Sequence, residues 1–160
     1  PAYQTATAAW PGATFAQVIG DLQRMISALE TQSAGNFQDG MNVTLVLPLG
    51  YRAVMNKMNP VSAVGETVLT WLTNQLPNLR IIYVPEFVGA NASANVAYMI
   101  IENMNDGDDA GGATISQLVP ERYRVLGSEN RIKGYIEDAT NAVAGIIIER
   151  PWAFTRMTGV

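Results

Sequence analysis

The stretch TFAQVIGDLQRMISALETQS, residues 14–33, is the most regular part of the chain and decides how the rest can be arranged. Thr14 and Gln17 have the spacing of a capping box, and Gly35 followed by Asn36 ends the segment. At 1.5 Å per residue the predicted helix is a rod of roughly 30 Å. Its apolar side chains recur at the spacing of one helical face, which comprises Phe15, Val18, Ile19, Leu22, Met25, Ile26 and Leu29.

The segments around this helix have the patterns of short helices and strands. Residues 1–13 are small and polar and are expected to form an extended lead-in. Short helices are expected at 48–58 and 66–76, where proline stands at the first turn or just beyond the last. The order predicts an α+β fold with helices on a mixed or antiparallel sheet, and one side of the long helix against strands near the C-terminus. Strands are expected at residues 43–47, 79–84, 96–101, 114–119, 132–136 and 144–149, with a last, edge strand at 152–157.

The composition is that of a folded domain with an acidic balance. Hydrophobic residues make up 48% of the 160 residues and charged residues 15%, which supplies a core and excludes a disordered chain. A net charge of −4 argues against wrapping nucleic acid through a basic field. Arg122, Arg124, Arg131 and Lys133 do fall close together in the sequence. We interpret them as solvated or subunit-facing charges in preference to a nucleic-acid patch.

Two residue types that carry much enzyme chemistry are absent. Without cysteine the chain has no disulfide framework, thiolate metal site or cysteine nucleophile, and without histidine it has no Ser-His-Asp triad or imidazole ligand. Four carboxylates lie in or beside predicted strands, but their spacing selects no catalytic pair: Glu86, Glu102, Glu137 and Asp138. We therefore assign no catalytic, cofactor-binding or metal-binding residue and expect no enzyme activity.

The acidic segment at residues 103–113 is the most tempting candidate site, and it fails the test for a calcium loop. If Gly107 takes the invariant glycine position, the third and twelfth positions fall on Met104 and Ala113, whose side chains do not bind calcium. A solvated surface loop is the favoured interpretation. Trp71 and Trp152 are likewise expected to pack in a core or an interface and not to form a sugar-binding platform.

Nothing in the sequence directs the chain to a membrane. No apolar run approaches the ~20 residues that cross a bilayer. The first four residues, PAYQ, have neither the basic nor the apolar region of a signal peptide. Because the chain does not begin with methionine, we expect it to be trimmed or to be a piece of a longer protein.

Several segments, taken in order, resemble one family. They are VTLVLP at 43–48, LTNQLPNLRIIYVPE at 72–86, PERYR at 120–124 and AGIIIERPWAFTRMTGV at 144–160. Together they resemble the major capsid proteins of tailed bacteriophages and prophages, whose Hong Kong ninety-seven-type fold is shared with encapsulins. The arginine–proline pair before an aromatic strand is the most telling match, and the resemblance covers roughly residues 12–160.

The resemblance implies a division of the chain. Residues 1–13 are then a lead-in, 14–42 the spine helix of the peripheral domain, 43–143 the axial domain, and 144–160 closing strands that return to the peripheral domain. The family's N-terminal arm and extended loop do not fit into the lead-in, so the chain resembles the capsid protein from its spine helix onward. For that reason we expect this 160-residue piece alone to be monomeric or weakly associated. The acidic loop is expected to be mobile and to lie near the capsomer axis.

The function implied by the resemblance is that of a structural subunit. Copies would assemble into pentamers and hexamers of an icosahedral shell that encloses the genome, in the host cytoplasm, and end in the virion. Scaffold or decoration proteins are further candidate partners; sequence-specific nucleic acids, membranes and cofactors are not. The alternatives are an encapsulin-type shell, a phage tail or adhesin binding module and, less favoured, a small carboxylate hydrolase.

Overall fold

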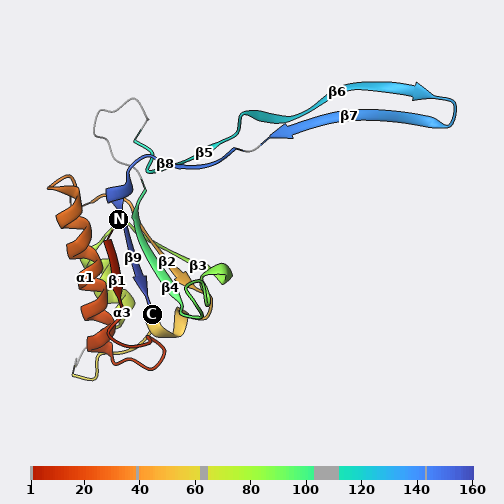
Figure 1. Cartoon of the computed structure of the whole chain (residues 1–160). Helices are drawn as coiled ribbons and strands as arrows, with labels where there is room; N and C mark the ends of the chain where they lie inside the picture. Colours follow the sequence, from red (N-terminus) through yellow and green to blue (C-terminus); the bar gives the residue numbers. More distant parts are fainter. Residues whose placement is uncertain (1, 39, 62–64, 103–111, 143) are drawn as a thin grey trace. The chain divides into compact units, whose positions relative to one another are not determined.

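The computed structural model describes residues 2–38, 40–61, 65–102, 112–142 and 144–160, which divide into two compact units (Figure 1). The first unit comprises Pro1–Thr114 and Arg150–Val160, and the second comprises Ile115–Glu149. The second unit is therefore an insertion into the first. Its boundaries differ from those expected for the peripheral and axial domains, whose assignment stays a prediction.

The long helix forms where the sequence predicts it. Helix α1 spans Phe15–Ser33, and Thr14 is its N-cap. The Thr14 hydroxyl accepts a hydrogen bond from the Gln17 amide at 3.3 Å, while Gln17 Oε1 accepts one from the Thr14 amide at 2.8 Å. This reciprocal pair is the predicted capping box. The helix ends at Ala34, which adopts a left-handed conformation with φ of 49°.

A mixed five-stranded sheet lies beside α1 in the order β1-β9-β4-β2-β3. Strand β9 pairs antiparallel with β4, which pairs antiparallel with β2, whereas β1 with β9 and β2 with β3 are parallel. The predicted mixed α+β class is confirmed. The strands are β1 (Ala2–Thr5), β2 (Val43–Pro48), β3 (Leu79–Val84), β4 (Val96–Ile101) and β9 (Phe154–Thr158).

Two sequence predictions about this sheet are wrong. The final strand is not an edge strand, because β9 lies between β1 and β4. Pro151, which suggested an edge, lies outside β9 in the short 3₁₀ helix Pro151–Ala153, so it removes no hydrogen bond from the sheet. The edge is formed by β1, within the segment expected to be only a lead-in.

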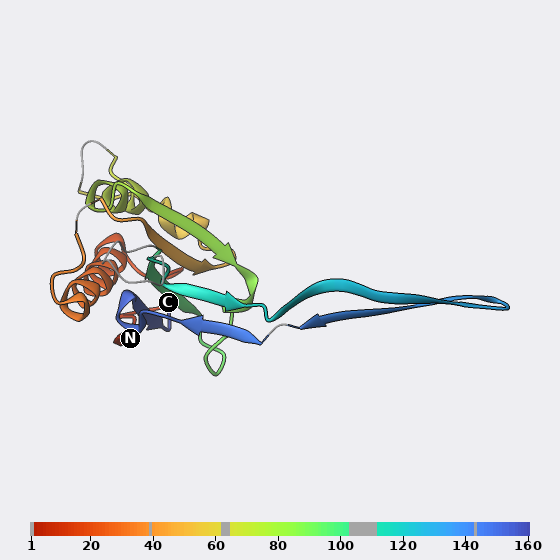
Figure 2. The same ribbon diagram turned by 90° about the horizontal axis from the view of Figure 1, so that it is seen from above.

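The helices cover one face of the sheet. Helix α2 is Arg52–Met55, shorter than predicted, and α3 is Val68–Gln75, as predicted to within a few residues. Helix α1 contacts β9 and β1, as its apolar stripe predicts, and α1 and α3 lie on the same side of the sheet (Figure 2). Trp71 and Trp152 pack against this core, as predicted. Its fully buried side chains include Trp10, Leu22, Met25, Leu29, Leu45, Leu47, Met55, Leu72, Met99 and Met157.

A buried carboxylate fastens the N-terminal segment to α1. Asp21 is fully buried and accepts hydrogen bonds from the indole Nε1 of Trp10 at 2.8 Å and from the Thr7 hydroxyl at 2.7 Å. It also accepts the Thr7 amide and pairs with the Arg24 guanidinium. Burial raises the pKa of Asp21, but the hydrogen bonds from Thr7, Arg24 and Trp10 outweigh burial, so the pKa lies below the ordinary value of 3.8.

Replacing the Asp21 carboxylate tests how much these hydrogen bonds stabilise the first unit. We expect Asp21→Asn to lower the free energy of unfolding by about 2–3 kcal/mol at pH 7, because an amide cannot accept all the donors that the carboxylate satisfies. The folded-state pKa lies below the unfolded one, so this stabilisation is present above about pH 4 and is lost as pH falls through the folded-state pKa. Urea denaturation should show that the difference in free energy of unfolding between the wild type and Asp21→Asn is smaller at pH 3 than at pH 7. Glu30→Gln, an exposed carboxylate on the same helix, should change stability little at either pH.

In the residues that the structure describes, the second unit is built from two pairs of strands. Strands β5 (Ile115–Leu118) and β8 (Gly145–Ile148) pair antiparallel, close to the predicted strands at 114–119 and 144–149. Strands β6 (Glu121–Arg131) and β7 (Gly134–Ala142) form an antiparallel ribbon. The strand predicted at 132–136 overlaps β7 but begins two residues too early and ends too early, because residues 132 and 133 form the turn and β7 continues to Ala142. We call β5–β8 the stem and β6–β7 the ribbon.

Candidate functional site

The carboxylates that sequence reasoning considered do not form a catalytic pair. Glu137 and Asp138 are consecutive in β7 and therefore point to opposite faces of the ribbon. Glu102 accepts a hydrogen bond from Thr44 and lies 3.7 Å from Arg80. Glu86 lies in the 3₁₀ helix Pro85–Phe87. Among the described residues no group of three or more potential metal ligands is found, and residues 103–111 of the acidic loop lie outside the described residues.

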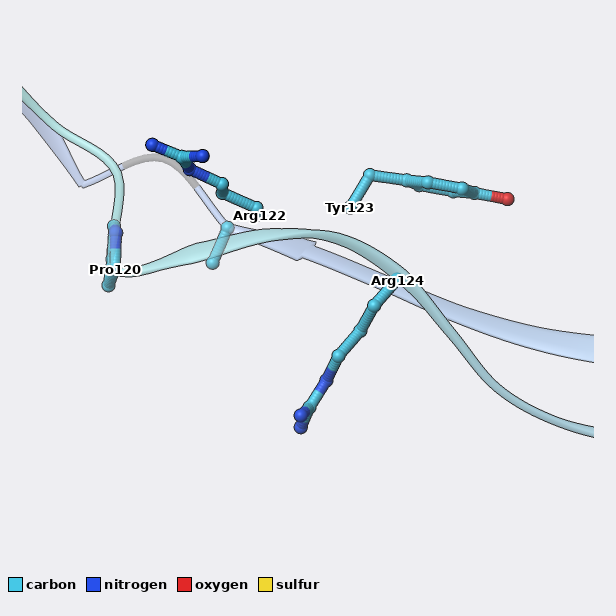
Figure 3. Close-up of a pocket in the computed structure, with 5 residues that line it drawn as sticks. Pro120, Arg122, Tyr123 and Arg124 are labelled. Carbon is cyan, nitrogen blue, oxygen red and sulfur yellow. The ribbon is translucent and has the colours of Figure 1, made fainter.

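The four basic residues of the second unit do not form one patch. Arg122 and Arg124 lie at the start of β6, where they line an open hollow with Pro120, Tyr123 and Ala142, and their side chains point away from each other (Figure 3). Arg131 ends β6 and Lys133 lies in the turn. Arg131 lies seven positions after Arg124 along the strand, which corresponds to roughly 23 Å. Acidic residues of the ribbon lie between them, which favours the predicted solvated or subunit-facing role.

The second unit exposes an unusual amount of apolar surface. Ile132 at the turn is fully exposed, and Ile146 in the stem is 72% exposed. Two-stranded sheets are marginally stable by themselves, and large exposed apolar surfaces mark interaction sites. A partner that covers the stem and the ribbon would stabilise the two-stranded sheets and bury their exposed apolar side chains. The exposed side chains are Ile115, Leu118, Val119, Tyr123, Val125, Leu126, Ile132, Tyr135, Ile136, Ile146, Ile147 and Ile148.

The first unit has an open surface on the face of its sheet opposite the helices. Val46, Val96 and Phe154 point to this face and are buried by their neighbours, but they are not part of the main hydrophobic cluster under the helices. Ile82 and Ile100 on the same face are only half-buried. We call this surface the open face. A sheet face that carries such side chains is suited to packing against another surface.

A row of three side chains crosses the open face. Tyr3 of β1, Arg156 of β9 and Tyr98 of β4 are paired in register. The Arg156 guanidinium carbon lies 5.7 Å from the centre of the Tyr3 ring and 6.0 Å from that of Tyr98. Tyr98 also contacts Phe87, with ring centres 5.3 Å apart. The row is therefore a cation held between two aromatic rings.

The residues that flank the second unit in the sequence form hydrogen bonds within the first unit. Arg150 is almost fully buried, and its guanidinium donates to the Ala113 carbonyl at 2.5 Å. The Thr114 hydroxyl donates to the carbonyl of Ile101, the last residue of β4. These contacts tie both ends of the insertion to the edge of the core. The arginine–proline pair of the closing segment thus has a structural role at the point where the chain returns.

Sequence reasoning missed the ribbon and the row around Arg156. Strand β6 is polar and charged along most of its length, so it shows no alternation of apolar and polar residues. The three consecutive isoleucines at residues 146–148 predict a strand, which is β8 of the stem, but they do not indicate the ribbon. Tyr3, Tyr98 and Arg156 are far apart in the sequence, and only the sheet register brings them together.

The fold is that of proteins that build shells. The chain is similar to the capsid protein of Myoviridae phage XM1, with a TM-score of 0.73 and 12% sequence identity over 99% of this chain and 51% of that one. It is also similar to the virus-like particle protein from Pyrococcus furiosus, with a TM-score of 0.56 and 15% identity over 98% of this chain and 55% of that one. At these identities the likeness shows the fold alone. The chain spans about half the length of these two structures.

The sequence itself defines the family. A family model described as Pa193 gp26 major capsid protein matches residues 1–159, so the chain belongs to this family of major capsid proteins. The predicted resemblance is confirmed, and the match extends through the lead-in. The family is structural and not enzymatic, and it places the protein in the virion. Among curated proteins none matches the chain, and no described helix is long and apolar enough to cross a membrane.

Proposed function

We propose that this chain is part of a shell subunit that assembles with copies of itself into a closed capsid around the genome. The observation that supports this most directly is the second unit, a pair of two-stranded sheets whose apolar side chains are exposed in the single chain. A monomer that leaves such a surface uncovered is built for association. Family membership supports the same function.

We further propose the finer arrangement. Copies form rings of five and six through head-to-tail contacts, because one such contact closes into either ring with a slight change of angle. Residues 14–42 and 144–160 then belong to the peripheral domain and 43–143 to the axial domain, whose acidic loop approaches the ring axis. Assembly takes place in the host cytoplasm, with scaffold or decoration proteins as additional partners. No residue of the chain acts as a catalyst.

A nanocompartment shell is the second candidate. The similarity to the virus-like particle protein from Pyrococcus furiosus favours it, since the two chains share the fold. The two candidates differ in what the shell encloses. Particles that package nucleic acid support the capsid, and particles that enclose only protein support the nanocompartment.

The test is expression of the complete coding sequence that contains this chain. Negative-stain electron microscopy should show closed shells, and light scattering after size-exclusion chromatography should give a mass of many subunits. The 160-residue chain alone should elute as a monomer or a weak oligomer, because it spans about half the length of the two similar structures and we expect the rest of the complete protein to supply part of the ~1,000 Å² that a stable interface buries in total. Discrete dimers of the complete protein, without rings or shells in any condition, would show that the proposal is wrong.

A further inference from the structure

We propose that the open face of the five-stranded sheet receives the ribbon of a second copy of this chain, with Arg156 binding the carboxylate of Glu137. This inference rests on the proposed function, because it names the partner surface in the assembled shell. On the open face Tyr3 is exposed and Arg156 and Tyr98 are half-buried, the ribbon is largely exposed, and neither surface belongs to the main hydrophobic cluster. Arg156 and Glu137 are then the charged pair at the centre of a contact in which Tyr3, Tyr98 and Tyr135 also take part.

The Arg156 side chain is prepared for an anion. The guanidinium carbon lies 5.7 Å from the Tyr3 ring centre and 6.0 Å from that of Tyr98, and a guanidinium in contact with aromatic rings can still donate hydrogen bonds through its N–H groups. The side chain is half-buried, so its charge is only partly solvated in the single chain. A carboxylate that reaches the terminal nitrogens would neutralise this charge and form charge-assisted hydrogen bonds with them. A carboxylate is therefore the group that suits this position.

Glu137 is the acid of the ribbon that is placed to supply it. Glu129 forms an ion pair with Arg131 at 3.4 Å, and the register puts Asp138 on the same face as these two. Glu137 points to the other face, opposite Ser128, and pairs with no cation among the described residues. Tyr135, which is 69% exposed, shares the face of Glu137 because the two are separated by two residues in β7.

The spacing of the two surfaces agrees. Tyr135 and Glu137 are about 7 Å apart along their strand, which is also the separation of same-face rows along the strands of a sheet. When Glu137 meets the row of Tyr3, Arg156 and Tyr98, Tyr135 can lie over the next row. On one side that row consists of Phe154, Ile100, Thr44 and Arg80, of which Phe154 and Ile100 offer the apolar surface that an exposed tyrosine covers well.

The distribution of charge argues against two other contacts, one between two ribbons and one between the open face and a nucleic acid. Two ribbons packed side by side would bring the basic ends of each against the basic ends of the other, since Arg122 and Arg124 lie at one end and Arg131 and Lys133 at the other. A nucleic acid would need a basic stripe. On the open face, however, Arg80 is already beside Glu102, and the chain as a whole carries a charge of −4.

The experiment is a charge exchange in the complete protein. Arg156→Glu and Glu137→Arg should each raise the protein concentration needed for assembly at least about tenfold, because like charges in a contact cost several kcal/mol and 1.4 kcal/mol is a factor of ten. The double variant Arg156→Glu/Glu137→Arg should recover most of the loss. Asp138→Arg makes the same charge change one residue away on the opposite face of β7, so it should assemble as the wild type does.

Mixing the two single variants distinguishes a second copy from the same chain. In the mixture the open face of an Arg156→Glu chain can receive the ribbon of a Glu137→Arg chain, and the unchanged Arg156 of the latter can receive the unchanged Glu137 of the former. Light scattering should therefore rise well above that of either variant alone. Recovery in the double variant but none in the mixture would overturn the second copy in favour of a contact within one chain. If Arg156→Glu assembled normally but its particles lost nucleic acid, Arg156 would face the genome and the inference would be wrong.

Two controls keep the outcomes interpretable. Circular dichroism should show the same melting temperature for every variant to within a few degrees, and if Arg156→Glu does not fold, Arg156→Gln removes the charge while keeping most of the side chain. A wild-type protein that never assembles contradicts the proposed function. A wild type that assembles, together with Arg156 and Glu137 variants that assemble equally well, contradicts only this inference.

Discussion

Replacing Ile115–Glu149 by a short glycine–serine linker in the complete protein is expected to abolish shell assembly while leaving the first unit folded. The first unit contains the hydrophobic core and the five-stranded sheet, to which the second unit contributes no strand. A short linker can close the gap, because Ile115 and Ile148 are paired in register and paired Cα atoms lie about 5 Å apart. The second unit carries most of the exposed apolar side chains, so the loss of association should be complete.

The measurements are the melting temperature by circular dichroism and particle formation by electron microscopy. A deletion variant that still forms normal shells would show that the second unit is not an assembly element. Should the deletion variant fail to fold, the double substitution Ile146→Lys/Ile148→Lys places charges on the exposed stem without shortening the chain. It should weaken assembly and leave the melting temperature unchanged. Val61→Lys, a similar change at an 89% exposed residue of the first unit, is its matched control.

Replacing Leu22 by aspartate is expected to unfold the first unit. Leu22 is fully buried at the centre of the apolar face of α1. Removing a buried leucine side chain costs about 2–5 kcal/mol, and burying a carboxylate without a partner adds several more. Because folded proteins are stable by about 5–15 kcal/mol, the sum approaches or exceeds the whole stability. The variant should aggregate on expression or show no cooperative thermal transition.

The control for this substitution is its neighbour on the helix. Gln23 is exposed, so Gln23→Asp introduces the same side chain without entering the core. It should melt within a few degrees of the wild type. A soluble Leu22→Asp variant with an unchanged melting temperature would contradict the central place of α1 in the fold.

Sequence patterns that extend over a few residues predicted the long helix and the central strands, each of which buries apolar side chains. The long helix was predicted with its cap at Thr14, since capping depends on residues three positions apart. Strands β2, β3 and β4 were predicted because each is a short run of mainly apolar side chains, half of them β-branched. Helix α2 was predicted too long, because the apolar spacing from Tyr51 to Met58 continues after the hydrogen-bonded turns have ended at Met55.

Local signals failed where pairing or exposure decides the structure. The ribbon is largely solvated on both faces in the single chain, so neither strand needs alternating apolar residues, and the turn at 132–133 lacks the asparagine–glycine or aspartate–glycine pair that marks tight hairpins. The parallel pairing of β1 with β9 joins the two ends of the chain. No short-range pattern specifies that partnership.

The sequence by itself determined the class of protein, the absence of histidine and cysteine chemistry, and the helix on which the core is built, because each depends on residue types or on neighbours along the chain. Only the tertiary structure decided that the last strand lies inside the sheet, that the helices leave one face open, and that Arg156 lies between Tyr3 and Tyr98 on that face. Those features arise from contacts between residues distant in sequence. Their energies depend on strand order and register, which the buried faces select together when the chain folds.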